Sequence, residues 1–369
     1  MSERQPIRVW HFGPGGVRGR GGMGRFLAYL IPALNRENSG VVCRVIDTYG
    51  PGAFWQMPFW FAGAVWSLFW GALRRRVDAV HVHMAAYGSI PRKMLLVMLG
   101  GAFRLPTVVH MHGADLVEFV DRLPQFVKYF FIIRLKKVTN IVVIGEYWRY
   151  YLTRDLGVPA DRVVVVHNGV PDPRKDVALA GQNLERADHR LLSLGELGPR
   201  KGTPELLAAL AAPRLRALSW SAILAGNGPV DDYREQVRRL ELADRVELPG
   251  WIESVQAWRL LAESGVFILP SRMEGLPVAI LEAMAMGAAV VTTPVGAIAD
   301  AIEDGVTGLL VPPGDAPALA DAIARLLEEP ELRARLTDAA RRRFEAQFTI
   351  ERTAEQVAAL YRRIAVRRE

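Results

Sequence analysis

The sequence predicts an α/β fold with two domains, each built on a doubly wound parallel sheet. Short apolar runs that suit buried parallel strands alternate with longer helical stretches through both halves of the chain. This alternation is typical of doubly wound sheets. The 369 residues suit about two domains, and half of them are hydrophobic, which is ample for two cores.

The expected elements divide between residues 1–172 and 173–350, with a polar linker near Pro171 to Ala187. Strands are predicted at 7–11, 41–46, 78–83, 107–112, 140–144 and 162–166 in the first half, and at 190–195, 219–225, 245–248, 265–269, 289–292 and 308–311 in the second. Helices are predicted at 204–211, 277–286, 316–328 and 351–366. Ligands of such sheets bind beyond the carboxyl ends of the strands.

Two glutamates follow the apolar run 266–269 of the second half. Glu274 lies in the loop after this predicted strand, and Glu282 lies about two turns inside a helix that Pro277 can open and Gly287 can close. The free N–H groups of the helix N-terminus suit a diphosphate, and the two carboxylates suit sugar hydroxyls on either side. The alternative is a capping acid followed by a solvated helix acid.

A second loop in the same half places cations beside a predicted helix. Arg200 and Lys201 follow the strand that ends near Leu194, and Thr203 is the expected N-cap, with Pro204 at the first helical position. Phosphate-binding cations belong at this point of an α/β sheet. Glycines on both sides let a bulky anion approach the backbone, although two loop cations can also be merely solvated.

The first half carries a glycine-rich segment and a set of histidines. Residues 13–24 contain seven glycines between a strand and a helix, but they match neither a dinucleotide fingerprint nor a Walker loop. The alternation of a strand puts His81 and His83 on one face, and His110 and His112 likewise. Four imidazoles suggest zinc, yet no acidic or Cys ligand lies at tight spacing, so a hydrogen-bonding role at a sugar is favoured over a metal site.

Taken together and in order, these motifs resemble the family 4 retaining glycosyltransferases, particularly bacterial members that build exopolysaccharide and other surface glycans. The resemblance runs nearly end to end. The motifs that carry it are Gly13-Pro14-Gly15-Gly16, Gly21-Gly22-Met23-Gly24-Arg25-Phe26, His81-Val82-His83-Met84, Gly88-Ser89, Arg92-Lys93, His110-Met111-His112-Gly113-Ala114-Asp115, His167-Asn168-Gly169-Val170, Lys201-Gly202, Ala225-Gly226-Asn227-Gly228-Pro229, Leu248-Pro249-Gly250-Trp251, Glu274 with Glu282, Pro294-Val295-Gly296-Ala297-Ile298 and Gly308-Leu309-Leu310-Val311-Pro312.

The resemblance implies the GT-B architecture, in which two Rossmann-like domains face each other across a cleft. Residues 1–172 would bind the acceptor, residues 173–350 would bind the nucleotide sugar, and the C-terminal helix within 351–369 would pack back on the first domain. The family transfers sugar with retention at the anomeric carbon and without a metal or other cofactor.

The resemblance also implies roles for individual residues. Glu274 would hold hydroxyls of the transferred sugar, His112 would lie beside that sugar, and Arg200 and Lys201 would stabilise the leaving diphosphate. Glu282 would bind the ribose. The remaining donor-binding residues would be Gly16, Gly22, Gly24, Gly195, Gly226, Gly250, Trp251, Gly275, Leu276 and Pro277, and the acceptor-side candidates are His83, Arg92 and Asp115. One residue departs from the pattern: this chain has Glu196 where many relatives have arginine.

Charge and aromatic content point to a membrane surface as a further partner. The net charge is +7 and the pI is about 9.7, and no nucleic-acid-binding motif is present. An aromatic stretch at 53–73 precedes Arg74-Arg75-Arg76, and residues 126–137 mix large apolar side chains with cations. Both segments look interfacial, although they can also be helices of the core. A membrane span at 53–73 fits by length but is interrupted by proline, glutamine and glycine.

The expected function is therefore a retaining transferase that moves a hexose from a nucleotide-diphosphate sugar to a lipid-linked or oligosaccharide acceptor. The expected location is the cytoplasm, on the inner face of the plasma membrane, because the one cysteine is Cys43 and no signal peptide is visible. The alternatives are a sugar-nucleotide epimerase of the same architecture and a catalytically silent scaffold that binds sugar nucleotide.

Overall fold

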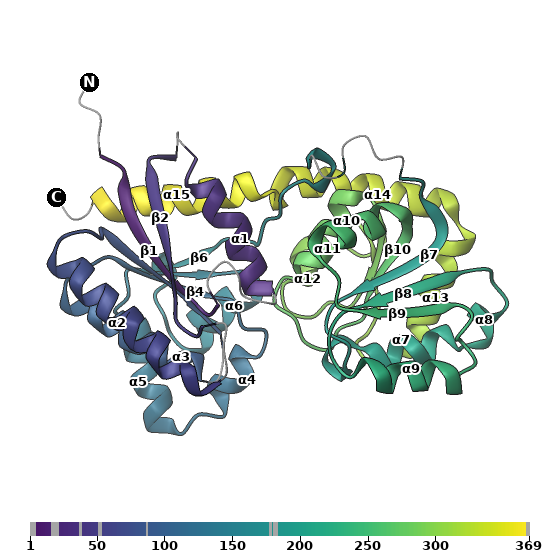
Figure 1. Ribbon diagram of the computed structural model, residues 1–369, viewed down its shortest axis with the longest axis horizontal. Coiled ribbons are helices and arrows are strands. Elements are labelled where there is room, and N and C mark those ends of the chain that lie inside the picture. The colour runs from purple at the N-terminus through teal and green to yellow at the C-terminus, as the bar shows by residue number, and fades with distance from the viewer. Residues whose placement is uncertain are drawn as a thin grey trace. The chain divides into compact units, whose positions relative to one another are not determined.

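The chain folds into two compact units. The computed structural model describes residues 5–15, 22–36, 39–50, 54–85, 88–176, 179 and 184–366. The first unit comprises Met1–Gly169 together with Ile350–Glu369, and the second comprises Val170–Thr349 (Figure 1). The division falls three residues before the expected one at 172/173, and the last helix belongs to the first unit.

Each unit contains a six-stranded parallel sheet. The order in the first is β2-β1-β3-β4-β5-β6, and in the second it is β12-β11-β10-β7-β8-β9. The strands of the first unit are β1 (Ile7–Gly13), β2 (Val41–Asp47), β3 (Ala79–Met84), β4 (Thr107–Met111), β5 (Asn140–Val143) and β6 (Val163–Val165). Those of the second are β7 (Ala187–Leu194), β8 (Ser221–Ala225), β9 (Val246–Gly250), β10 (Ser264–Leu269), β11 (Ala289–Thr292) and β12 (Leu309–Leu310). The doubly wound prediction is confirmed for both halves.

Helices cover both faces of the first sheet. They are α1 (Gly22–Leu34), α2 (Met57–Leu73), α3 (Ser89–Ala102), α4 (Leu116–Asp121), α5 (Gln125–Leu135), α6 (Glu146–Tyr150) and α15 (Ile350–Val366). In Figure 1, α1 and α15 lie on one side of this sheet, and α2, α3 and α5 lie on the other. Phe26, Leu30, Val357 and Tyr361 bury their side chains in one core cluster with the strands, so the last helix completes the first unit's core.

The second unit is covered by α7 (Thr203–Leu210), α8 (Pro213–Arg216), α9 (Val230–Arg239), α10 (Ser254–Glu263), α11 (Val278–Met286), α12 (Ile298–Ala301), α13 (Ala316–Glu328) and α14 (Pro330–Arg343). Short 3₁₀ turns occur at Phe54–Gln56, Ala160–Arg162, Pro173–Lys175 and Pro199–Lys201, and π turns occur at Tyr151–Asp155 and Phe344–Phe348. Leu206, Leu210 and Ile323 belong to the core that these helices form with the sheet.

The helix that carries Glu282 ends as predicted, but the helix after Lys201 begins differently. Gly287 closes α11 in the left-handed conformation, with φ of 77°. Thr203 was expected to be an N-cap, and this is wrong: the cap position is Gly202, with φ of 72°, and Thr203 is the first helical residue. The Thr203 hydroxyl instead accepts a hydrogen bond from the backbone N–H of Gly198 at 2.9 Å, so it closes the preceding turn.

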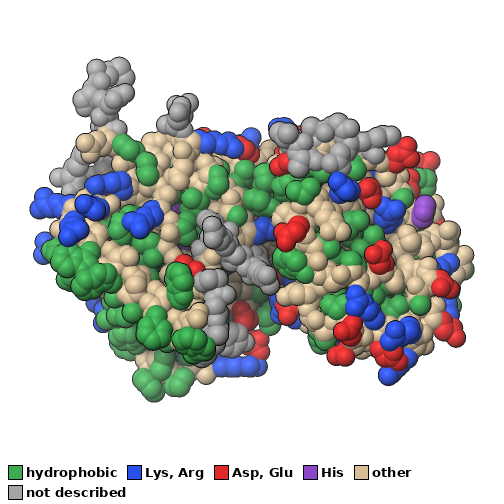
Figure 2. All heavy atoms as spheres, in the orientation of Figure 1, with side chains coloured by type: hydrophobic (Ala, Val, Ile, Leu, Met, Phe, Trp, Pro, Cys, Tyr) green, Lys and Arg blue, Asp and Glu red, His purple; other side chains and the backbone are tan. Residues whose placement is uncertain are grey.

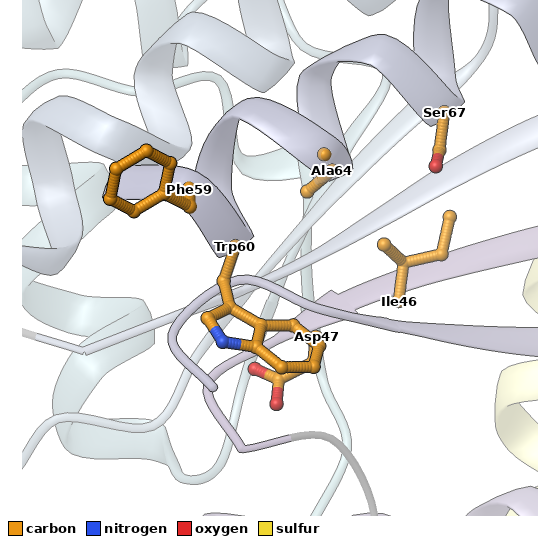
Figure 3. Close-up of a pocket in the computed structure, with 7 residues that line it drawn as sticks. Ile46, Asp47, Phe59, Trp60, Ala64 and Ser67 are labelled. Carbon is orange, nitrogen blue, oxygen red and sulfur yellow. The ribbon is translucent and has the colours of Figure 1, made fainter. Parts of the chain in front are cut away.

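Helix α2 buries little of its apolar surface. Only Ala64, Leu68 and Gly71 of its 17 residues are buried. A pocket of about 380 Å³ separates part of the helix from β2, with Phe59 and Trp60 on one wall and Ile46 on the other (Figure 3). Figure 2 shows hydrophobic side chains gathered on this part of the first unit, over α2, α3 and α5. Among the described residues, no helix is long and apolar enough to cross a bilayer.

Candidate functional site

Two charged residues meet at the carboxyl edge of the second sheet. Lys201 ends the turn after β7, and Glu274 lies in the loop after β10. The Lys201 ammonium forms an ion pair with the Glu274 carboxylate, whose Oε1 also accepts a hydrogen bond from the Ser271 hydroxyl at 2.7 Å. Glu274 is only 6% exposed. The fold thus brings together two residues that the sequence analysis assigned to one site.

The loops that carry this pair touch one another through glycine backbones. A Cβ on Gly202 would lie 2.0 Å from the Pro270 carbonyl oxygen, and a Cβ on Gly296 would lie 2.0 Å from that of Glu274. Backbone hydrogen bonds join the same loops, from Arg272 N–H to the Arg200 oxygen at 2.9 Å and from Ala297 N–H to the Gly275 oxygen at 3.0 Å. A side chain at either glycine would force the loops apart, so the pair depends on these glycines.

The N-terminus of α11 opens beside Glu274. Its cap residue is Pro277, which makes no side-chain cap hydrogen bond, and Gly275 and Leu276 precede it. The first turn therefore keeps its partial positive charge for a ligand. With Lys201 nearby, the edge suits a phosphate group.

Glu282 lies deeper than the sequence analysis expects of a ribose ligand. Its side chain is fully buried, and its Oε1 accepts a hydrogen bond from the Trp258 indole N–H at 3.0 Å. A ribose hydroxyl can reach this carboxylate only if neighbouring side chains give way. Burial could not be read from sequence, because it depends on how α10 packs against α11.

Arg200 and Glu196 form an ion pair at 3.2 Å, with both side chains about half exposed. Exposed pairs of this kind are worth little, so either partner can turn to a ligand. Glu196, where an arginine was expected from the resemblance, thus pairs with Arg200 in this structure. At the end of β9, Gly250 has φ of 82° and Trp251 is 54% exposed. Gly226 lies against Gly195, where an added Cβ would meet the Gly195 oxygen at 1.6 Å.

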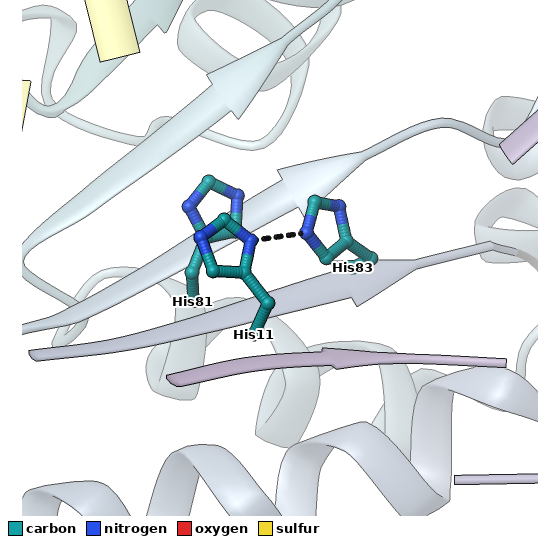
Figure 4. A group of neighbouring side chains, drawn as sticks. All are labelled: His11, His81 and His83. Atoms are coloured by element: carbon teal, nitrogen blue, oxygen red, sulfur yellow. Dashed lines mark hydrogen bonds between the residues drawn. The ribbon is translucent and has the colours of Figure 1, made fainter. Parts of the chain in front are cut away.

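Five histidines gather on one face of the first sheet. Parallel pairing places His11 beside His81, and Figure 4 shows these two rings with His83. The same pairing places His83 beside His110, and His112 follows the end of β4. His11, His81, His83 and His110 are fully buried, whereas His112 is partly buried. His11 was not among the residues predicted from the sequence. The available signal was a third histidine in a strand that pairs with the His81 strand.

The imidazoles form a hydrogen-bonded chain that ends on α15. His112 Nε2 lies 2.9 Å from His83 Nδ1, and His83 Nε2 lies 3.0 Å from His11 Nδ1. His11 Nε2 lies 3.1 Å from the Tyr361 hydroxyl, which lies 2.5 Å from His81 Nδ1. Burial lowers the pKa of His11 and of His112 to about 3 and lowers the pKa values of His81, His83 and His110 well below 6.5. The rings are therefore neutral at neutral pH.

Their geometry suits hydrogen bonding better than metal binding. Ring nitrogens of His11, His81 and His83, and of His83, His110 and His112, lie within 4.8 Å of one another. The centroids of His11 and His83 lie 5.3 Å apart although two of their nitrogens are 3.0 Å apart, so these nitrogens point at each other. His110 stacks face to face on His112 at 4.0 Å and 28°. Neither arrangement aims three lone pairs at a common point, as a metal ion requires.

The remaining first-unit candidates lie around the same strand ends. Gly22 and Gly24 lie in the first turn of α1, so the glycine-rich loop is shorter than the sequence predicts, and Gly16 lies outside the described residues. Arg92, on α3, lies over the Tyr49 ring at 5.9 Å. Asp115 occupies the cap position of α4 without capping it. The carboxyl edge of this sheet therefore keeps its acceptor-side candidates, of which His83 is the most deeply buried.

Comparison with known proteins gives the family. Residues 20–174 match the family model described as Glycosyltransferase Family 4, and residues 178–343 match that of Glycosyl transferases group 1. The putative colanic acid biosynthesis glycosyltransferase WcaL of Escherichia coli is 30% identical over 300 residues, which cover 77% of this chain and 70% of that protein. The chain belongs to the family 4 glycosyltransferases.

One further relative and one solved structure are similar to this chain. The alpha-D-kanosaminyltransferase of Streptomyces kanamyceticus is 27% identical to this glycosyltransferase over 308 residues, covering 80% of each chain. The crystal structure of Anabaena HepE in complex with UDP and glucose superposes with a TM-score of 0.72 at 19% identity, covering 96% of this chain and 99% of that one. This likeness shows the shared GT-B fold.

Acidification is expected to destabilise the protein below pH 6.5. Because the pKa values of His11 and His112 fall from 6.5 to about 3 on folding, the unfolded chain binds more protons between these values. The contribution of these neutral imidazoles to the free energy of unfolding is fully present above pH 6.5 and is lost as the pH falls toward 3. One pH unit below 6.5, each imidazole that stays neutral contributes ~1.4 kcal/mol less to the free energy of unfolding. Urea unfolding on either side of pH 6.5 measures this loss.

The matched variant is His110→Leu. Within the described part of the chain, neither ring nitrogen of His110 has a hydrogen-bond partner, so leucine removes a titrating group and no hydrogen bond. The variant is expected to lose less stability on acidification than the wild type. Equal losses in the two proteins would contradict the assignment of acid sensitivity to the buried histidines.

Proposed function

We propose that this glycosyltransferase moves a hexose, with retention at the anomeric carbon, from a nucleoside diphosphate sugar to a lipid-linked glycan during surface polysaccharide assembly. The observation that carries the proposal is the Lys201–Glu274 pair beside the uncapped N-terminus of α11. Relatives named for colanic acid biosynthesis and for kanosaminyl transfer support the class of reaction. The HepE complexes with UDP and glucose support the class of donor.

The second unit supplies the groups that such a reaction needs. As the bond to the leaving diphosphate breaks, negative charge grows on its oxygens. Lys201, Arg200 and the N-terminal N–H groups of α11 stabilise that charge. Donor binding separates Lys201 from Glu274, which leaves the carboxylate free to accept hydrogen bonds from sugar hydroxyls. The departing phosphate oxygen takes the acceptor's proton on the same face of the sugar, which retains the anomeric configuration.

The first unit supplies the acceptor side. His112 lies at the end of β4, and Arg92 and Asp115 lie near the carboxyl edge of the same sheet. In this proposal His112 bonds a hydroxyl of the transferred sugar. Glu282 holds the ribose only after Trp258 and its neighbours shift.

The donor site is tested with Glu274→Gln, which keeps the size of the side chain and removes its charge. Transfer should fall roughly a hundredfold or more, because a charge-assisted contact that strengthens in the transition state is worth about 3 kcal/mol. Each purified protein is incubated with a panel of sugar nucleotides and a membrane extract, and the released nucleotide is measured. Nucleotide release shows transfer, whereas a changed sugar on an intact nucleotide shows an epimerase.

The matched control is Glu263→Gln, which removes a carboxylate paired with Arg190 elsewhere in the second unit. It should transfer sugar at the wild-type rate. Near-normal transfer by Glu274→Gln, or no release with any sugar nucleotide, would reject the proposed site.

Transfer is also expected to survive chelation. Across the described residues, neither Glu274 nor Glu282 belongs to a group of three potential metal ligands, and cations already face the phosphate position. The rate is measured with EDTA and then with added Mg²⁺ or Mn²⁺. Loss of transfer in EDTA, followed by its return with either ion, would overturn the metal-independent mechanism.

The membrane surface is proposed as the place where the first unit meets its acceptor. Large apolar side chains are exposed on neighbouring helices of that unit, as the green surface over α2, α3 and α5 in Figure 2 shows. They are Trp55, Phe59, Trp60, Trp66, Phe69, Leu95, Met98, Phe126, Tyr129 and Phe130. Cations lie among them: Arg74 lies 5.0 Å from the Trp70 ring and Arg134 lies 4.8 Å from the Phe130 ring. This pattern suits the boundary of an anionic bilayer on its cytoplasmic face.

Flotation with phosphatidylglycerol vesicles tests this docking. Replacing Arg74, Arg75 and Arg76 with glutamine should weaken binding roughly a hundredfold, because each cation near anionic lipid contributes about 1 kcal/mol. Binding should also fall with added salt. The charge-matched control replaces Arg234, Arg238 and Arg239, which lie on α9 of the second unit. Wild-type protein that stays unbound at low salt would show that the acceptor is met away from the bilayer.

A further inference from the structure

The hydrogen-bonded chain in the first unit joins the last helix to the histidine at the sugar. We infer that Tyr361, acting through His11 and His83, holds His112 in the tautomer whose Nδ1 accepts a hydrogen bond. Helix α15 thereby sets how His112 meets the transferred sugar. The inference about the sugar rests on the proposed function, whereas the inference about the tautomer stands on the geometry of this unit.

Three proton arrangements fill every bond of the chain, because the Tyr361 oxygen can donate to either neighbour or accept from both. Five neutral groups, His112, His83, His11, Tyr361 and His81, share four hydrogen bonds, and each group carries one proton. At His83 and at His11, each of which has one N–H and one lone pair, the two bonds must run in the same direction. Otherwise two protons meet in one contact and none remains for the next. The direction of the bond between His11 and Tyr361 therefore fixes the tautomer of His112.

The Tyr361 hydroxyl decides the direction. It lies 2.5 Å from His81 Nδ1 and 3.1 Å from His11 Nε2. Bonds from O–H to oxygen run between about 2.5 and 3.0 Å, and bonds from N–H to oxygen run from about 2.7 to 3.2 Å, so a contact at 2.5 Å is shorter than an N–H donor makes. Tyr361 thus donates to His81 and accepts from His11 Nε2–H. If the bond between Tyr361 and His81 ran the other way, His81 Nδ1–H would have to donate at 2.5 Å, which is shorter than the range for an N–H donor.

The rest of the chain follows from that direction. His11 carries its proton on Nε2, so its Nδ1 accepts from His83 Nε2–H at 3.0 Å. His83 Nδ1 in turn accepts from His112 Nε2–H at 2.9 Å. His112 is then left with a lone pair on Nδ1. A neutral ring in this state accepts a hydrogen bond from a sugar hydroxyl and repels a ligand group that offers only a lone pair.

The chain holds a tautomer and does not carry protons away. Its inner end is His81 Nε2, which is buried and has no hydrogen-bond partner among the residues that the structure describes. A proton taken up at His112 would need release at that nitrogen, and no described group accepts it there. Burial also opposes a charged imidazole, since the pKa values of these rings lie far below neutrality. Tyr361, His11 and His83 are therefore positioning residues.

The test is Tyr361→Phe in the full chain, with the imidazoles labelled with ¹⁵N. Phenylalanine removes both the acceptor of His11 Nε2–H and the short bond that Tyr361 donates to His81, so nothing then offsets the cost of the unpaired buried N–H on His11. His11 should move its proton to Nδ1 and donate to His83, which reverses the chain and leaves His112 protonated on Nδ1. Two-bond ¹H–¹⁵N correlation spectra distinguish the tautomers, and the His112 signals are assigned by their loss in His112→Gln.

A second variant should reverse the same hydrogen-bonded chain by a change at its His81 end. His81→Leu removes the acceptor of the Tyr361 hydroxyl, which then donates to His11 Nε2 and again reverses the chain. The matched control is Tyr151→Phe, because this buried hydroxyl of the same unit bonds Asp121 at 2.9 Å and lies outside the chain. The control should keep the wild-type tautomer. A wild-type spectrum with His112 protonated on Nδ1, or unchanged His112 signals in both test variants, would overturn the inference.

Transfer assays separate the tautomer from the sugar contact. In Tyr361→Phe the turnover number should fall roughly tenfold, the effect of one misdirected hydrogen bond. Affinity for the free nucleotide should not change, because the second unit binds it. An altered tautomer with an unaltered turnover number would refute the link to the sugar. If no sugar nucleotide is used even by the wild type, the proposed function fails, and the spectra still decide the tautomer.

Discussion

The close contact between loop backbones at the carboxyl edge of the second sheet is the constraint on which the candidate site depends. Parallel strands deliver every loop to the same edge, where the loops after β7, β10 and β11 must share little space. Gly202 and Gly296 make this possible, since a Cβ at either position would lie 2.0 Å from a carbonyl oxygen of the loop after β10. Lys201 and Glu274 are 73 positions apart in sequence, and they meet because these loops touch.

The first unit faces a different constraint, which is the burial of polar rings. Parallel register places His11, His81, His83 and His110 side by side, and α15 adds the Tyr361 phenol to the same face of the sheet. Buried polar groups need partners, and here His11, His83 and His112 are partners for one another, whereas His110 only stacks on its neighbours. Tyr361 matters because it is the partner of both His11 Nε2 and His81 Nδ1. The polar chain is thus part of the packing between the sheet and α15, and it limits which residues these positions tolerate.

The sequence predicts much of this fold and less of the site. All twelve strands were placed within a few residues, because buried parallel strands are short apolar runs with clear boundaries. Glu274, Lys201 and the end of α11 at Gly287 followed from the same local patterns. His11 and Tyr361 did not, since their importance depends on strand register and on a helix 350 positions away. The burial of Glu282 and the capping role of Gly202 also depend on tertiary packing, which periodicity does not encode.

The path of the chain has a consequence for its biosynthesis. The second unit is one continuous segment, Val170–Thr349, whereas the first needs Ile350–Val366 to fill its core. On the ribosome, the strands of the first unit therefore wait for a helix that is made after the whole second unit, and the second unit can fold completely before the first. Until α15 emerges, the histidine face of the first sheet lacks both its cover and its phenol. The nascent first unit is then the stage at which a chaperone would find exposed apolar surface.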